Sequence, residues 1–132
     1  NYKTHSPLTR LVDACYTESY SSRNFTLLVK KNCDQSGVCR NRDRIKKQLK
    51  IWIESTEAFI KIANQSKALL EAKPIAYKAL ELMEISWAQV NSPSEINPTQ
   101  KERANILISE LKYYNLDCKF VATEGIELLF KK

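Results

Sequence analysis

Glycine is almost absent from this sequence. Only Gly37 and Gly125 occur among 132 residues, whereas average usage is about 7%. Glycine lets a backbone loop approach a phosphate group closely, and it supplies the positive φ angles of tight hairpins. The shortage excludes a glycine-rich nucleotide-binding loop and argues against a sheet built from many hairpins. It favours long helices instead.

Long hydrophobic runs and familiar catalytic motifs are also missing. The mean hydropathy is −0.42, and no apolar stretch approaches the roughly 20 residues of a membrane-spanning helix. The chain contains one histidine and neither a G-x-S-x-G nor an H-E-x-x-H motif. We therefore predict a non-enzymatic protein with no catalytic residue, no metal site and no cofactor. A small carboxylate-dependent hydrolase is an alternative, because that chemistry needs only two suitably spaced carboxylates. Its candidates are Glu54, Glu57, Glu81 and Glu84.

Four cysteines are present, and an even number in a short chain is typical of exported disulfide-bonded domains. The sequence begins without an initiator methionine or a signal peptide, which we interpret as a removed secretory signal. We predict a secreted or periplasmic protein, of bacterial or eukaryotic origin. Three pairings are possible for four cysteines, and we favour Cys33 with Cys39 and Cys15 with Cys118. The first bridge would close a short loop, and the second would join the first helix to the end of the chain.

The apolar pattern predicts a single all-α domain over residues 1–132, a disulfide-bridged helical bundle. A first helix opens at Ser6-Pro7 and ends in the polar stretch 19–24, and 24–31 fits either a helix or a strand. A longer helix over 41–73 has one apolar stripe and a second apolar face that includes Ile51 and Ala58. Pro74 begins the next helix, 91–98 is a loop, and 99–102 has the form of a capping box. The tail is interpreted as a helix, with a small C-terminal hairpin at about 118–131 (an α+β fold) as the alternative.

The positive charge is concentrated in one segment. Residues 30–50 contain eight basic and two acidic side chains. The net charge of this segment is therefore +6, the same as the formal net charge of the entire chain. Arginines near a helix N-terminus oppose the helix dipole, so their presence there suggests a role other than stability. We predict that this segment binds a partner through Arg40, Arg42, Arg44, Lys46, Lys47 and Lys50.

These observations favour an exported binding protein, such as an inhibitor, an immunity factor or a cell-envelope accessory factor. Its expected partner is an acidic protein surface, ahead of an anionic glycan or a lipid headgroup. Nucleic acid is disfavoured, because the remainder of the chain is electrically neutral and an exported protein seldom meets it. A secreted helical signalling ligand or effector is the alternative from another functional class.

Overall fold

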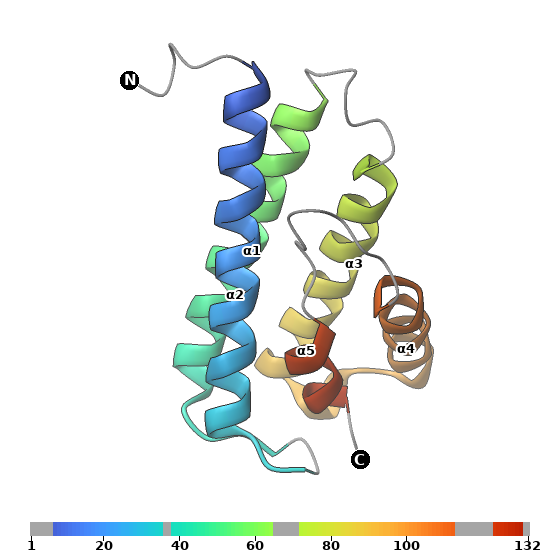
Figure 1. Cartoon of the computed structure of the whole chain (residues 1–132). Coiled ribbons are helices and arrows are strands. Elements are labelled where there is room, and N and C mark those ends of the chain that lie inside the picture. Colours follow the sequence, from blue (N-terminus) through green and yellow to red (C-terminus); the bar gives the residue numbers. More distant parts are fainter. Residues whose placement is uncertain (1–6, 36–37, 65–71, 113–122, 131–132) are drawn as a thin grey trace.

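Three long helices that alternate in direction form the all-α bundle that the sequence predicts (Figure 1). The computed structural model describes residues 7–35, 38–64, 72–112 and 123–130. Within them, α2 lies between α1 and α3, and α5 packs against α1, α3 and α4. In these ranges no helix is both long enough and apolar enough to cross a bilayer. The elements are α1 (Pro7–Asn32), α2 (Arg42–Ala63), α3 (Ala72–Asn91), the 3₁₀ turn η3 (Pro93–Glu95), α4 (Pro98–Lys112) and α5 (Thr123–Phe130).

Helix α1 begins at the predicted proline but is longer than predicted. It does not end in the polar stretch 19–24, and the ambiguous segment 24–31 is helix rather than strand. The serine hydroxyl of Ser21 is satisfied inside the bundle, by a carbonyl group of the same helix and by a side chain of α2. Ser21 Oγ lies 2.9 Å from the carbonyl oxygen of Thr17 and 3.0 Å from Ser55 Oγ. Packing against α2 therefore overrides the weak helix propensity of this stretch.

Helix α2 is shorter than predicted. It ends at Ala63, and the next described helix already begins at Ala72, while 65–71 lie outside the described residues. Pro74 lies in the first turn of α3, where a missing amide leaves no intrahelical hydrogen bond unmade. The second apolar face predicted for this helix (Ile51, Ala58, Ile62 and Leu69) is covered only in part. Ile51 and Ala58 are exposed, whereas Ile62 packs against the core, and Leu69 lies outside the described residues.

Helices α4 and α5 bear on two further predictions, the capping box at 99–102 and the form of the tail. The capping box of α4 is formed by Asn97 and Gln100 rather than by residues 99–102. The Gln100 amide donates to Asn97 Oδ1 over 2.8 Å, and the Asn97 amide donates to Gln100 Oε1 over 3.1 Å. Residues 123–130 form a helix, which contradicts the alternative hairpin over that range. The rest of the 118–131 segment, 118–122 and 131, lies outside the described residues.

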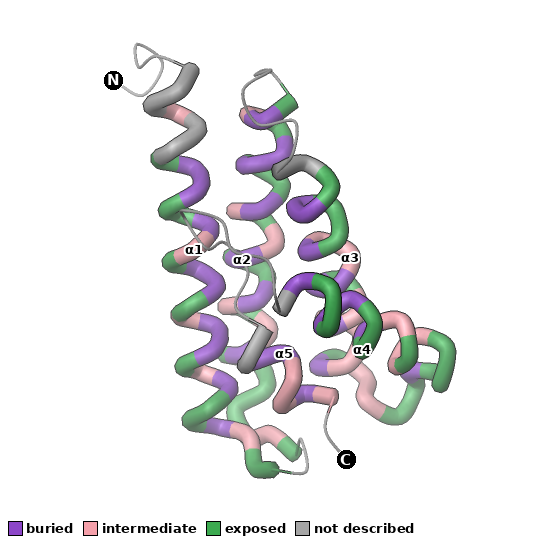
Figure 2. The backbone as a smooth tube through the Cα atoms, turned by 45° about the vertical axis from the view of Figure 1, so that its right-hand side comes forward, coloured by how far each residue is buried: buried purple, intermediate pink, exposed green. Residues whose placement is uncertain are grey.

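Buried residues of the described helices α1, α2, α3, α4 and α5 belong to one core, and Figure 2 shows where they lie along the backbone. The main stripe of α2 supplies its centre, as predicted from helical spacing. Phe25 of α1 and Trp52 of α2 meet there, with ring centroids 5.3 Å apart. The largest fully buried side chains are Trp52, Phe25, Phe59, Ile45, Leu49, Leu82, Met83, Leu107, Leu111 and Ile126.

Candidate functional site

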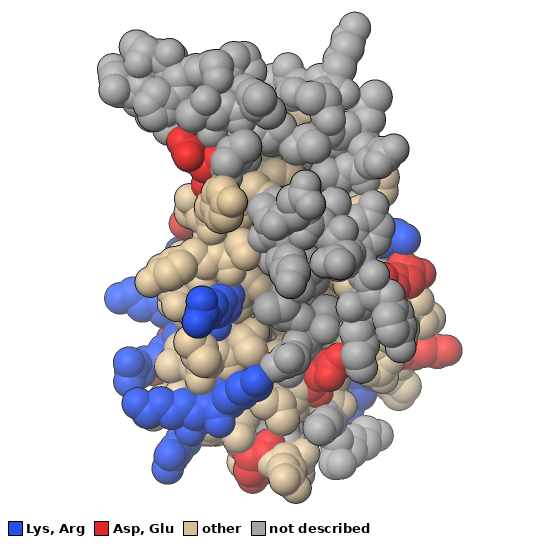
Figure 3. Space-filling model, viewed as in Figure 1, with Lys and Arg blue, Asp and Glu red and all other residues tan. Residues whose placement is uncertain are grey.

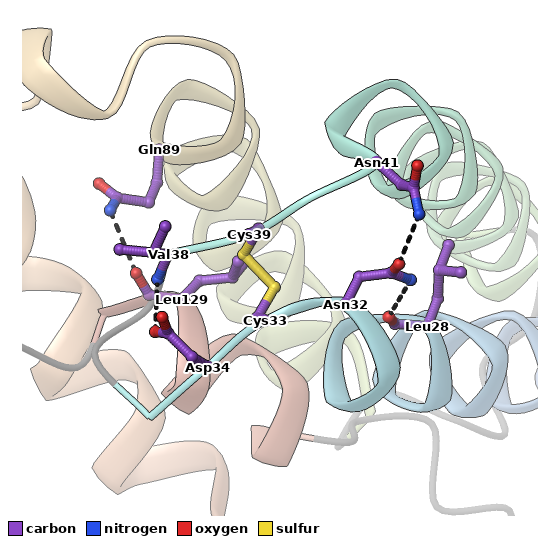
Figure 4. Close-up of a disulfide and its surroundings, with 9 residues drawn as sticks. All are labelled: Leu28, Asn32, Cys33, Asp34, Val38, Cys39, Asn41, Gln89 and Leu129. Atoms are coloured by element: carbon purple, nitrogen blue, oxygen red, sulfur yellow. Dashed lines mark hydrogen bonds between the residues drawn. A yellow bond between two sulfur atoms is a disulfide. The ribbon is translucent and has the colours of Figure 1, made fainter.

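A disulfide closes the connection between α1 and α2 (Figure 4). Cys33 and Cys39 are bonded as predicted, with Cα atoms 4.0 Å apart, and pair as an isolated antiparallel bridge. The Asp34 amide donates to the carbonyl oxygen of Val38 over 2.9 Å, and the Val38 amide donates to Asp34 Oδ1 over 3.0 Å. This short loop fixes where the chain enters α2.

The second predicted bridge involves Cys15, which is buried in the core and is disulfide-bonded. Cys118 lies outside the described residues, so this pairing stays a prediction. If it forms, it links α1 to the segment that precedes α5.

Asn41 occupies the N-cap position of α2 in an unusual way. It adopts a left-handed conformation with φ of 55° and makes no side-chain capping bond. Its Nδ2 instead donates to Asn32 Oδ1 over 2.8 Å, and Asn32 Nδ2 donates to the carbonyl oxygen of Leu28 over 2.8 Å. The side chain that would normally cap α2 thus ties it to the end of α1 (Figure 4). The first amides of α2 have no side-chain cap from Asn41.

The six predicted binding residues surround the first turns of α2 rather than forming one flat patch. Lys46 faces α3, where its Nζ lies 5.7 Å from the centre of the Trp87 ring. Arg42 also faces α3 and lines a narrow crevice with Gln89 of that helix. Lys47 and Lys50, three residues apart on the helix, are exposed.

The remaining two cations lie nearer α1. Arg44 precedes Gln48 by one helical turn, and Gln48 Nε2 donates to the carbonyl oxygen of Ser21 in α1 over 3.4 Å. Arg44 is therefore on the α1 flank of α2. Arg40 lies in the connection between α1 and α2 and lines an open pocket of about 340 Å³. The other lining residues are Lys31, Asn32, Cys33, Asp34, Val38 and Cys39. We call the six cations Arg40, Arg42, Arg44, Lys46, Lys47 and Lys50 the basic surface.

The first turn of α2 holds one acidic residue, Asp43, amid the cations of the basic surface. None of the six side chains takes part in an ion pair within the part of the chain that the structure describes. Figure 3 shows basic side chains gathered over the lower part of α1 and the α1–α2 connection. The bundle thus has one strongly cationic end.

Sequence reasoning missed a carboxyl group at the centre of the bundle. Glu18 is fully buried, and its Oε1 accepts hydrogen bonds from Trp52 Nε1 over 2.5 Å and from Thr56 Oγ1 over 3.4 Å. Its Oε2 has no hydrogen-bond partner among the described residues. Burial holds the pKa of Glu18 well above its ordinary value, although the bonds from Trp52 and Thr56 lower it.

A signal for this residue does exist in the sequence. Glu18 follows Cys15 by three residues and precedes Phe25 by seven, so it lies on the apolar stripe of α1. The signal was lost because the helix was predicted to end at the next residue. Because burial favours the neutral form of this carboxyl group, the oxygen without a partner carries less charge than it would in an ionised carboxylate.

The predicted hydrolase carboxylates are at the surface. Glu54, Glu57 and Glu84 are exposed. Glu81 accepts two hydrogen bonds from Arg103, over 2.6 and 2.8 Å, and these bonds lower the pKa of Glu81. Among the described residues, no group of three or more metal-ligating side chains could hold a metal ion.

Comparison with models of known protein families, with curated proteins and with solved structures gave no match.

Proposed function

We propose that this protein is an exported, non-enzymatic binding protein that engages an acidic protein through the basic surface. The observation that carries the proposal is the absence of compensating ion pairs around six cations at one end of the described bundle. Like charges held together raise the energy of the folded state, and an acidic partner relieves that repulsion.

The local architecture supports this function in two ways. The Cys33–Cys39 bridge and the Asn41–Asn32 hydrogen bond hold the entrance to α2 in place, so little ordering is needed on binding. The first turn of α2 also presents backbone amides without a side-chain cap, and these favour carboxylates. A disulfide is typical of an oxidising compartment, which supports export.

The experiment compares two double variants that change the net charge equally. Arg44→Glu/Lys47→Glu reverses two cations of the basic surface, and Lys61→Glu/Lys101→Glu reverses two cations elsewhere on α2 and α4. Each protein is immobilised, and extract from the native source is applied at low salt and eluted with NaCl. We expect wild type and the control variant to recover the same acidic proteins, which mass spectrometry identifies.

Purified partners are then measured by biolayer interferometry. We expect Arg44→Glu/Lys47→Glu to weaken binding about 100-fold, chiefly through slower association, because like charges across an interface cost several kcal/mol. Equal affinity of the two double variants would show that the basic surface is not the site. Retention on heparin or anionic vesicles without any acidic protein would point to a glycan or lipid ligand instead.

A further inference from the structure

Large apolar side chains form a line on the outward side of α1. Tyr16, Tyr20 and Leu27 are 63%, 67% and 55% exposed, although each has the kind of side chain that usually contributes to a core or an interface. Steps of four and seven residues place them on one face of the helix. This face is opposite to that of Phe25 and Val29, which are fully buried. Exposed residues follow this side of α1 in Figure 2.

Cations flank the lower half of this line. Arg23, Lys30 and Lys31 are exposed on the same outward side of α1. No acidic residue occurs in α1 after Glu18, which is buried. The apolar line therefore runs toward the end of α1 that joins α2, where Figure 3 shows basic side chains.

The face continues across the seam between α1 and α2. Gln48 and Ser55 of α2 bond to Ser21 of α1, which marks the seam. Arg44 and Ile51 share the stripe of α2 that contains Gln48 and Ser55, because the four residues follow one another by four, three and four positions. Ile51 is 43% exposed. Apolar and basic side chains of both helices thus form one surface.

We propose that this outer α1–α2 face docks an acidic protein that carries apolar side chains amid its carboxylates, with Tyr20 and Leu27 as the apolar contacts. The inference rests on the proposed function and specifies its partner. Tyrosine and arginine are the residues that dominate binding energy in protein interfaces, whereas a sulfated glycan or a phosphate gains nothing from an exposed leucine or isoleucine. A second copy of this chain would present the same positive charge and be repelled.

The experiment uses a yeast-displayed library of random 15-residue peptides, selected for binding to the full-length, oxidised wild-type protein. The test variant is Tyr20→Ala/Leu27→Ala. The matched control is Tyr77→Ala/Ile106→Ala, which removes one tyrosine and one aliphatic side chain that are 50% and 43% exposed on α3 and α4. Circular dichroism melting confirms that both variants fold.

We expect the selected peptides to combine Asp or Glu with aromatic or aliphatic residues. Tyr20→Ala/Leu27→Ala should weaken their binding about tenfold or more through faster dissociation, with the salt dependence unchanged. Tyr77→Ala/Ile106→Ala should bind as wild type does. Arg44→Glu/Lys47→Glu should slow association and reduce the salt dependence.

Three results would overturn the inference. The selected peptides could bind Arg44→Glu/Lys47→Glu weakly but Tyr20→Ala/Leu27→Ala as tightly as wild type. The proposed function would then remain supported, but the outer α1–α2 face would not be its binding site. Peptides that bind all variants equally, or that lack acidic residues, would contradict both proposals. A wild-type dimer in sedimentation that dissociates in Tyr20→Ala/Leu27→Ala would assign the face to self-association.

Discussion

Within the described helices, the carboxyl group of Glu18 has an environment far from that of ordinary solution. It is a buried carboxyl among groups that do not titrate: Trp52 and Thr56 face it from α2, and Thr56 in turn contacts Met83 of α3. Arg103 and Glu81, by contrast, form an ion pair whose side chains are both more than 40% exposed. Loss of water raises the pKa of Glu18, whereas the hydrogen bonds from Arg103 lower the pKa of Glu81. Their effects on stability therefore have opposite dependence on pH.

We predict that Glu18→Gln becomes progressively more stable than wild type as pH rises from 4 to 8. The unfolded chain releases this proton at about pH 4.3, whereas the native state retains it to higher pH. The free energy of unfolding of wild type therefore falls with rising pH, by at most about 1.4 kcal/mol per unit, until the native carboxyl also ionises. Glutamine does not titrate and removes this fall. Urea unfolding followed by circular dichroism measures the difference.

The exposed Glu54→Gln on α2 serves as the control for this prediction. Over the same pH range Glu18→Gln should diverge from wild type more than this control does, because Glu18 is buried and Glu54 is exposed. A constant offset of Glu18→Gln from wild type would show that the pKa of Glu18 is ordinary.

At the scale of whole elements, the contact between α5 and α1 depends on a missing side chain. A Cβ atom at Gly125 would lie 2.9 Å from the Cα atom of Thr26 and 3.1 Å from its Oγ1. The neighbour is backbone inside a long helix, which does not yield easily. The only way to accommodate a larger residue is to move α5 away from α1.

We predict that Gly125→Ala destabilises the protein by about 1–3 kcal/mol, the usual effect of overpacking. Helix propensity alone predicts the opposite sign, a gain of about 1 kcal/mol. The control is Asn105→Ala at an exposed position of α4, which should be neutral or slightly stabilising. Urea denaturation of both variants decides between packing and propensity, since a more stable Gly125→Ala would mean that α5 does not lie this close to α1.

The connection between α1 and α2 gives a second prediction at this scale. Replacing both cysteines in Cys33→Ser/Cys39→Ser opens a short loop and should lower the free energy of unfolding by about 2 kcal/mol. The loss should be larger at low salt, because two cations, Lys31 and Arg40, line the pocket at this loop with a single carboxylate, Asp34. Thermal melts at low and high NaCl concentration measure both effects. Equal melting temperatures of variant and wild type would show that hydrogen bonds hold this loop without the bridge.

The elements also show what a sequence can and cannot predict. The core stripe of α2 was readable because Leu49, Trp52 and Thr56 recur at helical spacing and each is covered. The length of α1 could not be predicted, because Ser21 and its neighbours become helical only when α2 supplies partners. Ile51 fits a buried pattern equally well but is exposed, since spacing does not reveal whether another helix covers a face.

At the scale of the whole molecule, the sequence predicts which segment carries the positive charge of the candidate site, but not how its side chains are arranged in space. The composition of residues 30–50 identified the basic segment, and the Cys33–Cys39 pairing was one of three possible pairings, favoured because it closes a short loop. How the cations divide between the α1 and α3 flanks of α2 depends on tertiary contacts, such as Lys46 with Trp87. The exposure of Tyr16 and Tyr20 on α1 likewise depends on which sides of this helix its neighbours cover, and Tyr20 also lies in the stretch 19–24 where the helix was predicted to end.

The positions of the two tryptophans, the only ones in the chain, have a consequence for spectroscopy. Trp52 is buried and donates to the Glu18 carboxyl, whereas Trp87 is half-buried beneath Lys46 of the basic surface. Indole emission shifts with the polarity and charge around the ring. We therefore expect pH titration to change the emission of Trp52 and an acidic ligand to change that of Trp87. Fluorescence spectra of Trp87→Phe and Trp52→Phe, recorded during each titration, would separate the protonation of the core from the occupation of the surface.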